Sequence, residues 1–178
     1  MLWMWFCCLN AFAGSLEGVT LPDTATVGGQ PVVLNGLGLR EKFYINVYVG
    51  GLYLPAKTTD SAKAINDDVV KRIVMHFTYG SVPKDKINET FDESFGNQGA
   101  AGTAQSANKE KLKAMMVDLV AHDEVVFEYV PGTGTTIFVK GVNKGTIPGV
   151  DFMKTLFSVY VGPNPPTSAL KSGMMSGN

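Results

Sequence analysis

Few side chains in this sequence have the type and spacing that catalysis or metal binding requires. His76 and His122 are the only histidines; the first lies on a predicted strand and the second at a predicted helix end, and a metal site needs more ligands than these. Asp92 and Glu93 are adjacent on a predicted helix and face different directions, so we interpret them as a solvated edge rather than an acid–base pair. The sequence has no phosphate loop, dinucleotide fingerprint, nucleophile elbow or HExxH pair. We therefore expect no metal and no cofactor.

Composition narrows the possible functions further. Both cysteines and both tryptophans lie within residues 1–13, and the rest of the chain has no cysteine. That remainder cannot be a disulfide scaffold, a thiol enzyme, a zinc finger or an iron–sulfur protein. The net charge is −1, the only arginines are Arg40 and Arg72, and no basic block is present, which argues against a nucleic-acid surface.

Residues 1–13 (MLWMWFCCLNAFA) have the character of a secretory signal peptide. They hold no charged residue and end in Ala11-Phe12-Ala13, after which the chain turns polar. The run is shorter than the roughly 20 apolar residues of a spanning helix, so we do not expect a membrane anchor. The sequence thus predicts one domain over residues 14–178 of a periplasmic or secreted protein. It gives no indication of the oligomeric state.

Alternating apolar residues predict the strands that must position any site. The clearest run is 43–54 (FYINVYVGGLYL), in which Gly50-Gly51 suggests a bulge or a close backbone approach. Its polar-tipped face holds Tyr44, Asn46 and Tyr48, and its core face holds Ile45, Val47 and Val49. Further strands are expected at 32–34, 72–79, 125–130, 135–141 and 143–147.

Helical periodicity predicts the covering helices. They are expected at 60–67, 83–96, 106–122 and 151–162, and the second of them buries Ile87, Phe91, Ser94 and Phe95. Residues 97–105 are small and polar, and we expect a mobile connection there. Paired strands and separate runs of helices indicate an α+β domain, in which helices pack on one face of an antiparallel sheet.

Several motifs, taken in order, resemble one known family. They are Asn35 to Arg40 (NGLGLR), Lys42-Phe43, Val47 to Leu54, Gly132 to Thr135, Ile147 to Phe152, Val161 to Pro163, Pro165-Pro166 and Leu170-Lys171. Together they resemble the chalcone isomerase family, most closely its bacterial secreted branch. The resemblance implies an open-faced β-sandwich: a large antiparallel sheet covered by a layer of helices, with a ligand cleft between them.

The resemblance also implies roles for particular residues. Plant enzymes of the family close a chalcone into a flavanone, whereas other members have no isomerase activity and bind fatty acids. Both kinds use an arginine that matches Arg40, whose planar guanidinium stays charged and can fix a phenolate or a carboxylate. The fatty-acid binders add a strand tyrosine that matches Tyr48, where the plant enzymes have threonine. Tyr44 and Asn46 share the predicted face of Tyr48 and are expected to line the same cleft.

Departures from the plant enzymes favour binding over ring closure. Where those enzymes have a tyrosine and an asparagine on the helix after the second long strand, this chain has Pro83 and Thr90. We therefore expect a non-catalytic protein that binds a small amphipathic acid such as a fatty acid. Its expected ligand contacts are Arg40, Tyr48, Tyr44, Asn46, Thr90 and Phe91, with Phe95 and Met115 also covering the apolar tail.

Two alternatives remain open. One is an isomerase, or intramolecular lyase, that acts on an unidentified conjugated substrate with Arg40 and Tyr48 as its catalytic residues. The other is an interaction protein whose cleft is incidental. Because Tyr48 follows Arg40 by eight positions, about 27 Å along a straight strand, a shared site requires a bend around Glu41-Lys42.

Overall fold

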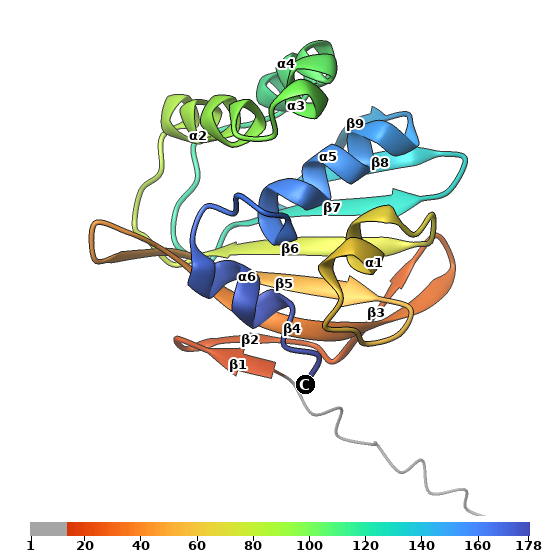
Figure 1. The fold of residues 1–178 in the computed structure, drawn as a ribbon. Coiled ribbons are helices and arrows are strands. Elements are labelled where there is room, and N and C mark those ends of the chain that lie inside the picture. The colour runs from red at the N-terminus through yellow and green to blue at the C-terminus, as the bar shows by residue number, and fades with distance from the viewer. Residues whose placement is uncertain (1–13) are drawn as a thin grey trace, which may run out of the picture.

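A seven-stranded antiparallel sheet is the frame of the molecule (Figure 1). The computed structural model describes residues 14–178, so the predicted leader, residues 1–13, lies outside the described residues. The strands pair in chain order: β3 (Thr24–Val27), β4 (Gln30–Lys42), β5 (Ile45–Leu54), β6 (Lys71–Phe77), β7 (Glu124–Val130), β8 (Gly134–Val139) and β9 (Val142–Ile147). A separate hairpin, β1 (Gly14–Leu16) with β2 (Val19–Leu21), contacts β4 through β1.

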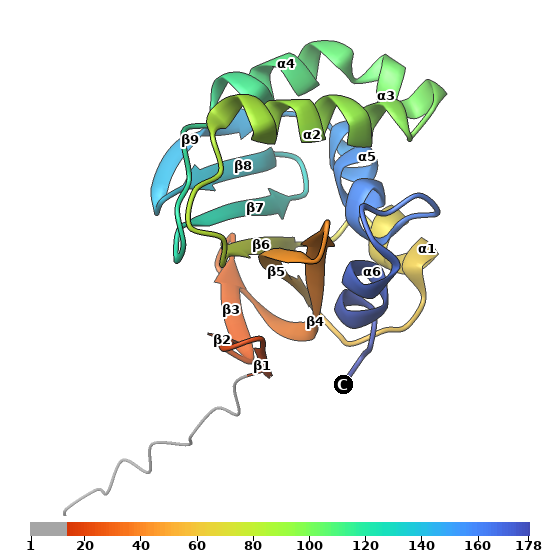
Figure 2. The same ribbon diagram turned by 90° about the vertical axis from the view of Figure 1, so that its left-hand side faces the viewer.

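Helices lie over one face of this sheet. They are α1 (Ser61–Asn66), α2 (Lys84–Gly96), α3 (Ala100–Ala104), α4 (Ser106–Ala114), α5 (Val150–Val161) and α6 (Ser168–Met174). Figure 1 shows α1, α5 and α6 against the strands, and Figure 2 shows α2, α3 and α4 as a group beside α5. The predicted α+β architecture, with an antiparallel sheet covered by helices, is confirmed.

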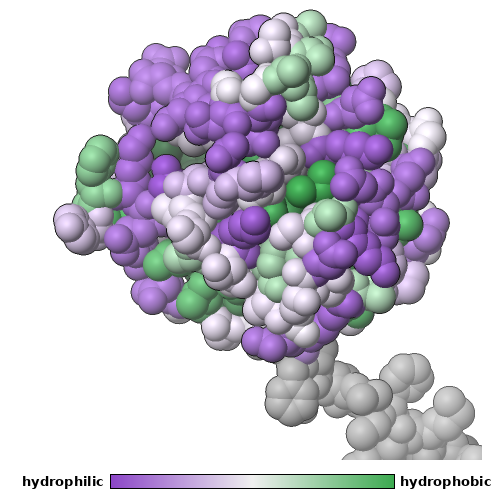
Figure 3. Space-filling model, viewed as in Figure 1, coloured by the Kyte–Doolittle hydropathy of each residue, from purple (hydrophilic) through white to green (hydrophobic). Residues whose placement is uncertain are grey.

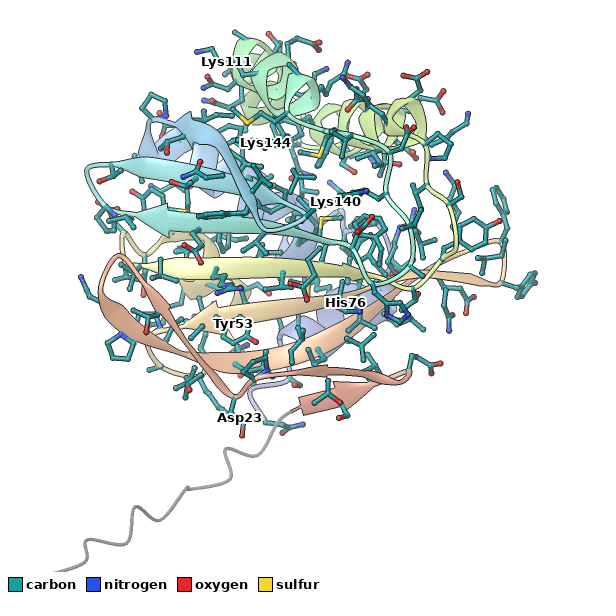
Figure 4. All side chains as sticks on the ribbon, turned by 180° about the vertical axis from the view of Figure 1, so that it is seen from behind. Asp23, Tyr53, His76, Lys111, Lys140 and Lys144 are labelled. Carbon is teal, nitrogen blue, oxygen red and sulfur yellow. The ribbon has the colours of Figure 1, made fainter. Side chains whose placement is uncertain are left out.

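Alternation along each central strand divides the buried side chains into two cores. The larger core fills the space between sheet and helices and includes Leu52, Ile73 and Phe127. The smaller core lies on the opposite face, where Tyr53 and Val74 pack with residues of the β1–β2 hairpin. Figure 4 views this second face, with Tyr53 labelled on it. The ligand cleft therefore has to be sought on the first face, beneath the helices.

The hairpin of β4 and β5 differs from the prediction in two ways. The second strand begins at Ile45, because Phe43 and Tyr44 form the turn. Gly50-Gly51 is a place of close approach rather than a bulge, since a Cβ on Gly51 would lie 2.6 Å from Leu21 Cδ1. A bulge lies instead at Val47: the register passes from Arg40 opposite Tyr48 to Glu41 opposite Asn46, which leaves Val47 as the extra residue. An extra residue reverses the alternation of side chains. As a result Val47 and Tyr48 both reach the helix side, whereas the Asn46 amide binds Glu17 on the β1–β2 hairpin.

The segment after α2 is more ordered than its composition indicates. Residues 97–105, expected to be a mobile connection, contain α3, and Gly102 packs so closely on α2 that an added Cβ would lie 1.8 Å from the carbonyl oxygen of Phe95. The helix expected at 106–122 ends at Ala114. It stops early because Leu119 instead exchanges two backbone hydrogen bonds with Val82, of 2.7 and 3.0 Å. His122 therefore lies in a turn before β7 rather than at a helix end.

The Asn35-Gly36-Leu37-Gly38 motif is part of β4 and receives α6. A Cβ on Gly38 would lie 1.9 Å from the carbonyl oxygen of Leu170, so only glycine permits this approach. The buried Asn35 side chain donates to the carbonyl oxygen of Met174 (2.8 Å) and accepts from the Thr58 N–H (2.7 Å). The motif thus fixes the C-terminal helix on the sheet.

Candidate functional site

A small cavity lies between the sheet and the inner faces of α2 and α5. Its volume is about 60 Å³. Its walls are mainly apolar, supplied by Met75, Phe77, Val82, Ile87, Phe91 and Val159. No aspartate, glutamate or histidine of residues 14–178 lines it. An apolar tail with a neutral or anionic group suits such a space, because a buried cation would have no carboxylate partner there.

The polar edge of the cavity is formed by the end of the β4–β5 hairpin. Arg40 stands opposite Tyr48 in the strand register, and Lys42 follows on the same side of β4. The Arg40 guanidinium donates to the carbonyl oxygen of Glu41 (2.7 Å) and is only partly buried. The bend that a shared site requires is the two-residue turn Phe43-Tyr44, just beyond Glu41-Lys42. This turn brings Arg40 and Tyr48 opposite each other on neighbouring strands.

Two tyrosines, Tyr48 and Tyr160, line this cavity. Burial raises the pKa of Tyr48 well above its usual value, and the nearby Arg40 offsets only part of that rise. Burial also raises the pKa of Tyr160, whose hydroxyl donates to the Met75 sulfur at 3.2 Å. Both hydroxyls stay protonated at neutral pH. The Tyr48 hydroxyl can donate a hydrogen bond to an oxyanion, whereas the single hydrogen of the Tyr160 hydroxyl is already donated to Met75.

A wider groove continues outward from the cavity. Its volume is about 470 Å³, which lies within the range of roughly 300–1,000 Å³ typical of small-molecule sites. Lys42, Val47, Val82 and Thr90 line both spaces. Beyond them the groove is bordered by Phe43, Ile45, Tyr79, Pro83 and the ion pair between Lys86 and Glu89 (2.8 Å). Cavity and groove are thus neighbours that share these four lining residues, and together we call them the cleft.

Four of the six predicted contact residues meet in this cleft. Arg40, Tyr48, Thr90 and Phe91 all line the inner cavity, although the Thr90 hydroxyl donates to the Lys86 carbonyl oxygen (2.9 Å) of its own helix. Tyr44 is 96% exposed in the β4–β5 turn, and the Asn46 amide donates to Glu17 Oε2 at 3.1 Å. The expectation that these two share the face of Tyr48 is wrong. Tyr44 belongs to the turn, and the extra residue Val47 reverses the alternation between Asn46 and Tyr48.

The two further residues expected over the ligand tail also lie outside the cavity. Phe95 stacks on Phe152 with ring centroids 6.2 Å apart, deep in the core. Met115 lies against Gly145 of β9, where its methyl group would be 3.3 Å from an added Cβ. Phe91 alone of the predicted tail contacts therefore borders the cavity.

Sequence reasoning missed Lys42 and Tyr160. Lys42 was detectable, because it follows Arg40 by two positions on one strand and so shares its face. Tyr160 lies in the helix expected at 151–162, and no sequence signal shows that it lines a cavity.

Other candidate groups have structural partners. His76 Nδ1 lies 2.9 Å from Glu124 Oε1 on the far face (Figure 4). Asp92 binds Lys109 and Lys113 at 2.6 and 2.7 Å, which joins α2 to α4. Within residues 14–178, no three histidine, cysteine or acidic side chains gather as a metal site would require. None of the helices in this part of the chain is long and apolar enough to cross a membrane.

Comparisons with known proteins agree with this architecture. The crystal structure of a fatty-acid binding protein of Arabidopsis thaliana superposes with a TM-score of 0.76, over 92% of this chain and 96% of that chain. The two sequences are 15% identical, so the likeness shows a shared fold. No curated protein matches the sequence. The sequence profile of a family described as chalcone isomerase-like matches residues 13–176. Because that match spans nearly the whole chain, the protein belongs to the chalcone isomerase-like family.

Proposed function

We propose that the protein binds a small amphipathic acid, such as a fatty acid, without converting it. The observation that carries the proposal is the apolar cleft with Arg40, Lys42 and Tyr48 at one edge and, within residues 14–178, no acidic side chain in its inner cavity. Charged hydrogen bonds from such groups to a carboxylate are among the strongest in proteins. The name of the plant protein of the same fold, a fatty-acid binding protein, adds support.

The sizes of the two spaces indicate how the ligand lies. The inner cavity, about 60 Å³, is smaller than the roughly 150 Å³ that accommodates benzene. It therefore takes only one end of a ligand, and the groove takes the rest. Lys42 lines both spaces, so the acidic group sits where they join, within reach of Arg40. The tail then runs along the apolar side chains of Val47 and Val82.

Fluorescence titration tests this proposal. The delipidated protein is titrated with a fluorescent fatty acid, and an unlabelled acid is then used to displace it. We expect Arg40→Gln to weaken binding at least about tenfold, since a charged hydrogen bond contributes about 1.5–3 kcal/mol. Arg72→Gln is the matched control, because Arg72 pairs with Glu128 at 3.2 Å outside the cleft. No uptake by the wild type, or equal affinity in both variants, would overturn the proposal.

The isomerase alternative has only Arg40 and Tyr48 as candidate catalytic groups. With the Tyr48 hydroxyl protonated and no histidine or carboxylate of residues 14–178 in the inner cavity, the described lining of that cavity offers hydrogen-bond donors but no general base. Following the absorbance of a chalcone with and without the protein separates the two functions. A rate above that of buffer, lost in Arg40→Gln, would favour the enzyme.

We also propose that residues 1–13 direct the protein to the periplasm or out of the cell. The support is the uncharged apolar run that ends in Ala11-Phe12-Ala13. Expression of the full chain, followed by fractionation and N-terminal sequencing, tests this. A chain in the periplasmic or extracellular fraction that begins near Gly14 is the expected result, and an intact Met1 in the cytoplasmic fraction would contradict it.

A further inference from the structure

The turn between β4 and β5 holds two aromatic residues in a backbone conformation that favours glycine. Phe43 and Tyr44 have φ values of 51° and 63°. For residues with a Cβ this left-handed region is strained, and bulky side chains rarely occupy it. Two-residue hairpin turns with positive φ at both positions normally use Asn-Gly or Asp-Gly.

The other hairpins of the chain show what such a turn ordinarily contains. Three more two-residue turns in residues 14–178 have positive φ at both positions, and all three have glycine second: Glu17-Gly18, Gly28-Gly29 and Lys140-Gly141. Only the β4–β5 turn has two large side chains. Because Phe43 and Tyr44 make this turn less stable, their presence calls for a role outside the fold.

Both side chains project into solvent at the mouth of the cleft. Phe43 is 82% exposed and Tyr44 is 96% exposed. The described part of the chain has six exposed large hydrophobic side chains. Two more of them, Ile45 and Tyr79, border the outer groove together with Phe43. The β4–β5 hairpin extends beyond the body at the left of Figure 1, and Figure 3 shows hydrophobic atoms there in the same view.

Two cationic side chains lie on the strand that leads into the aromatic tip. Arg40 and Lys42 precede it, and within residues 14–178 neither forms an ion pair with a carboxylate. Lys42 Nζ lies 5.8 Å from the centre of the Phe43 ring. Glu41 is the one acidic residue in this stretch. An aromatic tip with a net positive charge is complementary to a surface whose outer layer carries anionic groups and whose inner layer is apolar.

We propose that this tip, residues 40–45, docks on the surface of a lipid bilayer that contains anionic lipids. Phe43 and Tyr44 enter the interface, and Lys42 faces the lipid phosphates. Docking in this way places the outer groove, which Phe43 and Ile45 border, directly against the lipid. A molecule with an apolar tail then passes between bilayer and groove without crossing water. Binding to the bilayer itself needs no ligand, so it is independent of the proposed function.

Vesicle flotation without added fatty acid tests the docking. The full chain is mixed with vesicles of phosphatidylcholine, or of phosphatidylcholine with phosphatidylglycerol. The double variant Phe43→Asn, Tyr44→Gly supplies the residues that the turn prefers, so we expect it to fold with a higher midpoint of thermal unfolding. Val142→Ser is the matched control, because Val142 is 55% exposed beside the Lys140-Gly141 turn of another hairpin.

The expected result separates the variants. The wild type and Val142→Ser bind the mixed vesicles, more weakly at high salt, and the double variant loses about tenfold in partitioning, equivalent to about 1.4 kcal/mol. No vesicle binding by the wild type, or equal binding by all three proteins, would overturn the inference. A wild type that ignores vesicles but dimerises through the tip, as sedimentation would show, would overturn it in favour of a protein partner.

Discussion

At the scale of residues, the central feature is the juxtaposition of Arg40 and Tyr48 across one hairpin. The Tyr48 ring packs on Phe77, with centroids 5.4 Å apart, so its position is fixed by the core. Burial raises its pKa and the Arg40 charge partly offsets that rise, and within residues 14–178 no hydrogen-bond partner of its hydroxyl contributes. The hydroxyl is thus held at the cavity edge and is available to a ligand.

Tyr48→Phe is expected to lower the affinity for an acid while leaving the free energy of unfolding nearly unchanged. A hydrogen bond to a charged group contributes about 1.5–3 kcal/mol, so affinity falls about tenfold or more, whereas the ring packing is kept. The comparison variant Tyr129→Phe should instead keep its affinity for the acid and lose unfolding free energy, because the Tyr129 hydroxyl donates to Asp68 at 2.5 Å. Binding titrations and urea denaturation of both variants check this. A Tyr48→Phe protein that binds normally but unfolds more easily would show a structural role instead.

Lys71 gives a second prediction at this scale. Its side chain is fully buried, Nζ donates to the carbonyl oxygens of Ala64 (2.7 Å) and Ile65 (3.3 Å), and burial lowers its pKa from 10.5 to about 8. Between those values the unfolded chain binds the proton and the folded chain does not, so stability contributed by this group rises with pH.

Lys71→Met removes this dependence. Relative to the variant, the wild type should gain up to about 3 kcal/mol in unfolding free energy from pH 8 to pH 10.5, at about 1.36 kcal/mol per pH unit. Urea denaturation of both proteins at several pH values measures the difference. Parallel stability curves for wild type and variant would show that Lys71 keeps its ordinary pKa.

At the scale of elements, close backbone contacts decide where the helices lie. Gly38 on β4 and Gly173 on α6 meet without room for a side chain, and a Cβ on Gly173 would lie 2.0 Å from the Leu37 carbonyl oxygen. Leu170 and Met174 of α6 are fully buried in the larger core. The docking of α6 on β4 thus closes one side of the layer that contains the cleft.

Gly38→Ala should destabilise the protein by about 1–3 kcal/mol or more, because the backbone of α6 cannot yield as a flexible side chain would. The matched control is Gly80→Ala, whose new methyl group meets nothing within 4 Å and should change stability by less than about 0.5 kcal/mol. Chemical denaturation measures both, and limited proteolysis reports on the C-terminal helix. Equal stability of the two variants would contradict the close packing.

Elements with strong periodicity could be predicted from the sequence. The buried stripe of α2 and the strands β6, β7 and β8 all follow from local patterns, and the structure confirms them, except that the strand expected at 72–79 ends at Phe77 and leaves Tyr79 exposed. The positions of α3 and α6 depend on close backbone contacts, of Gly102 with the preceding helix at Phe95 and of Gly173 with the distant strand residue Leu37, which composition does not reveal. The bulge at Val47 is set by pairing with β4 and decided which predicted residues reach the cleft.

At the scale of the whole molecule, the cleft lies between the sheet and the helices α2 and α5, beside the turn that joins β4 and β5. Its inner cavity is enclosed by side chains from β4, β5, β6, α2 and α5, and its outer groove opens beside the exposed β4–β5 tip. One core holds the sheet to the helices and a second covers the opposite face. The family fold could be recognised from ordered motifs, whereas the shape and small size of the cavity follow from packing that no single motif encodes.

The central claim is that Arg40 anchors an acid in this cleft. Native mass spectrometry of the purified protein, beside Arg40→Ala, tests it most directly. We predict added mass from a small organic acid in the wild type and its loss in the variant, with the Arg72→Ala protein retaining it. Bare protein in all three samples, even after incubation with fatty acids, or the same added mass in Arg40→Ala as in the wild type, would contradict the account.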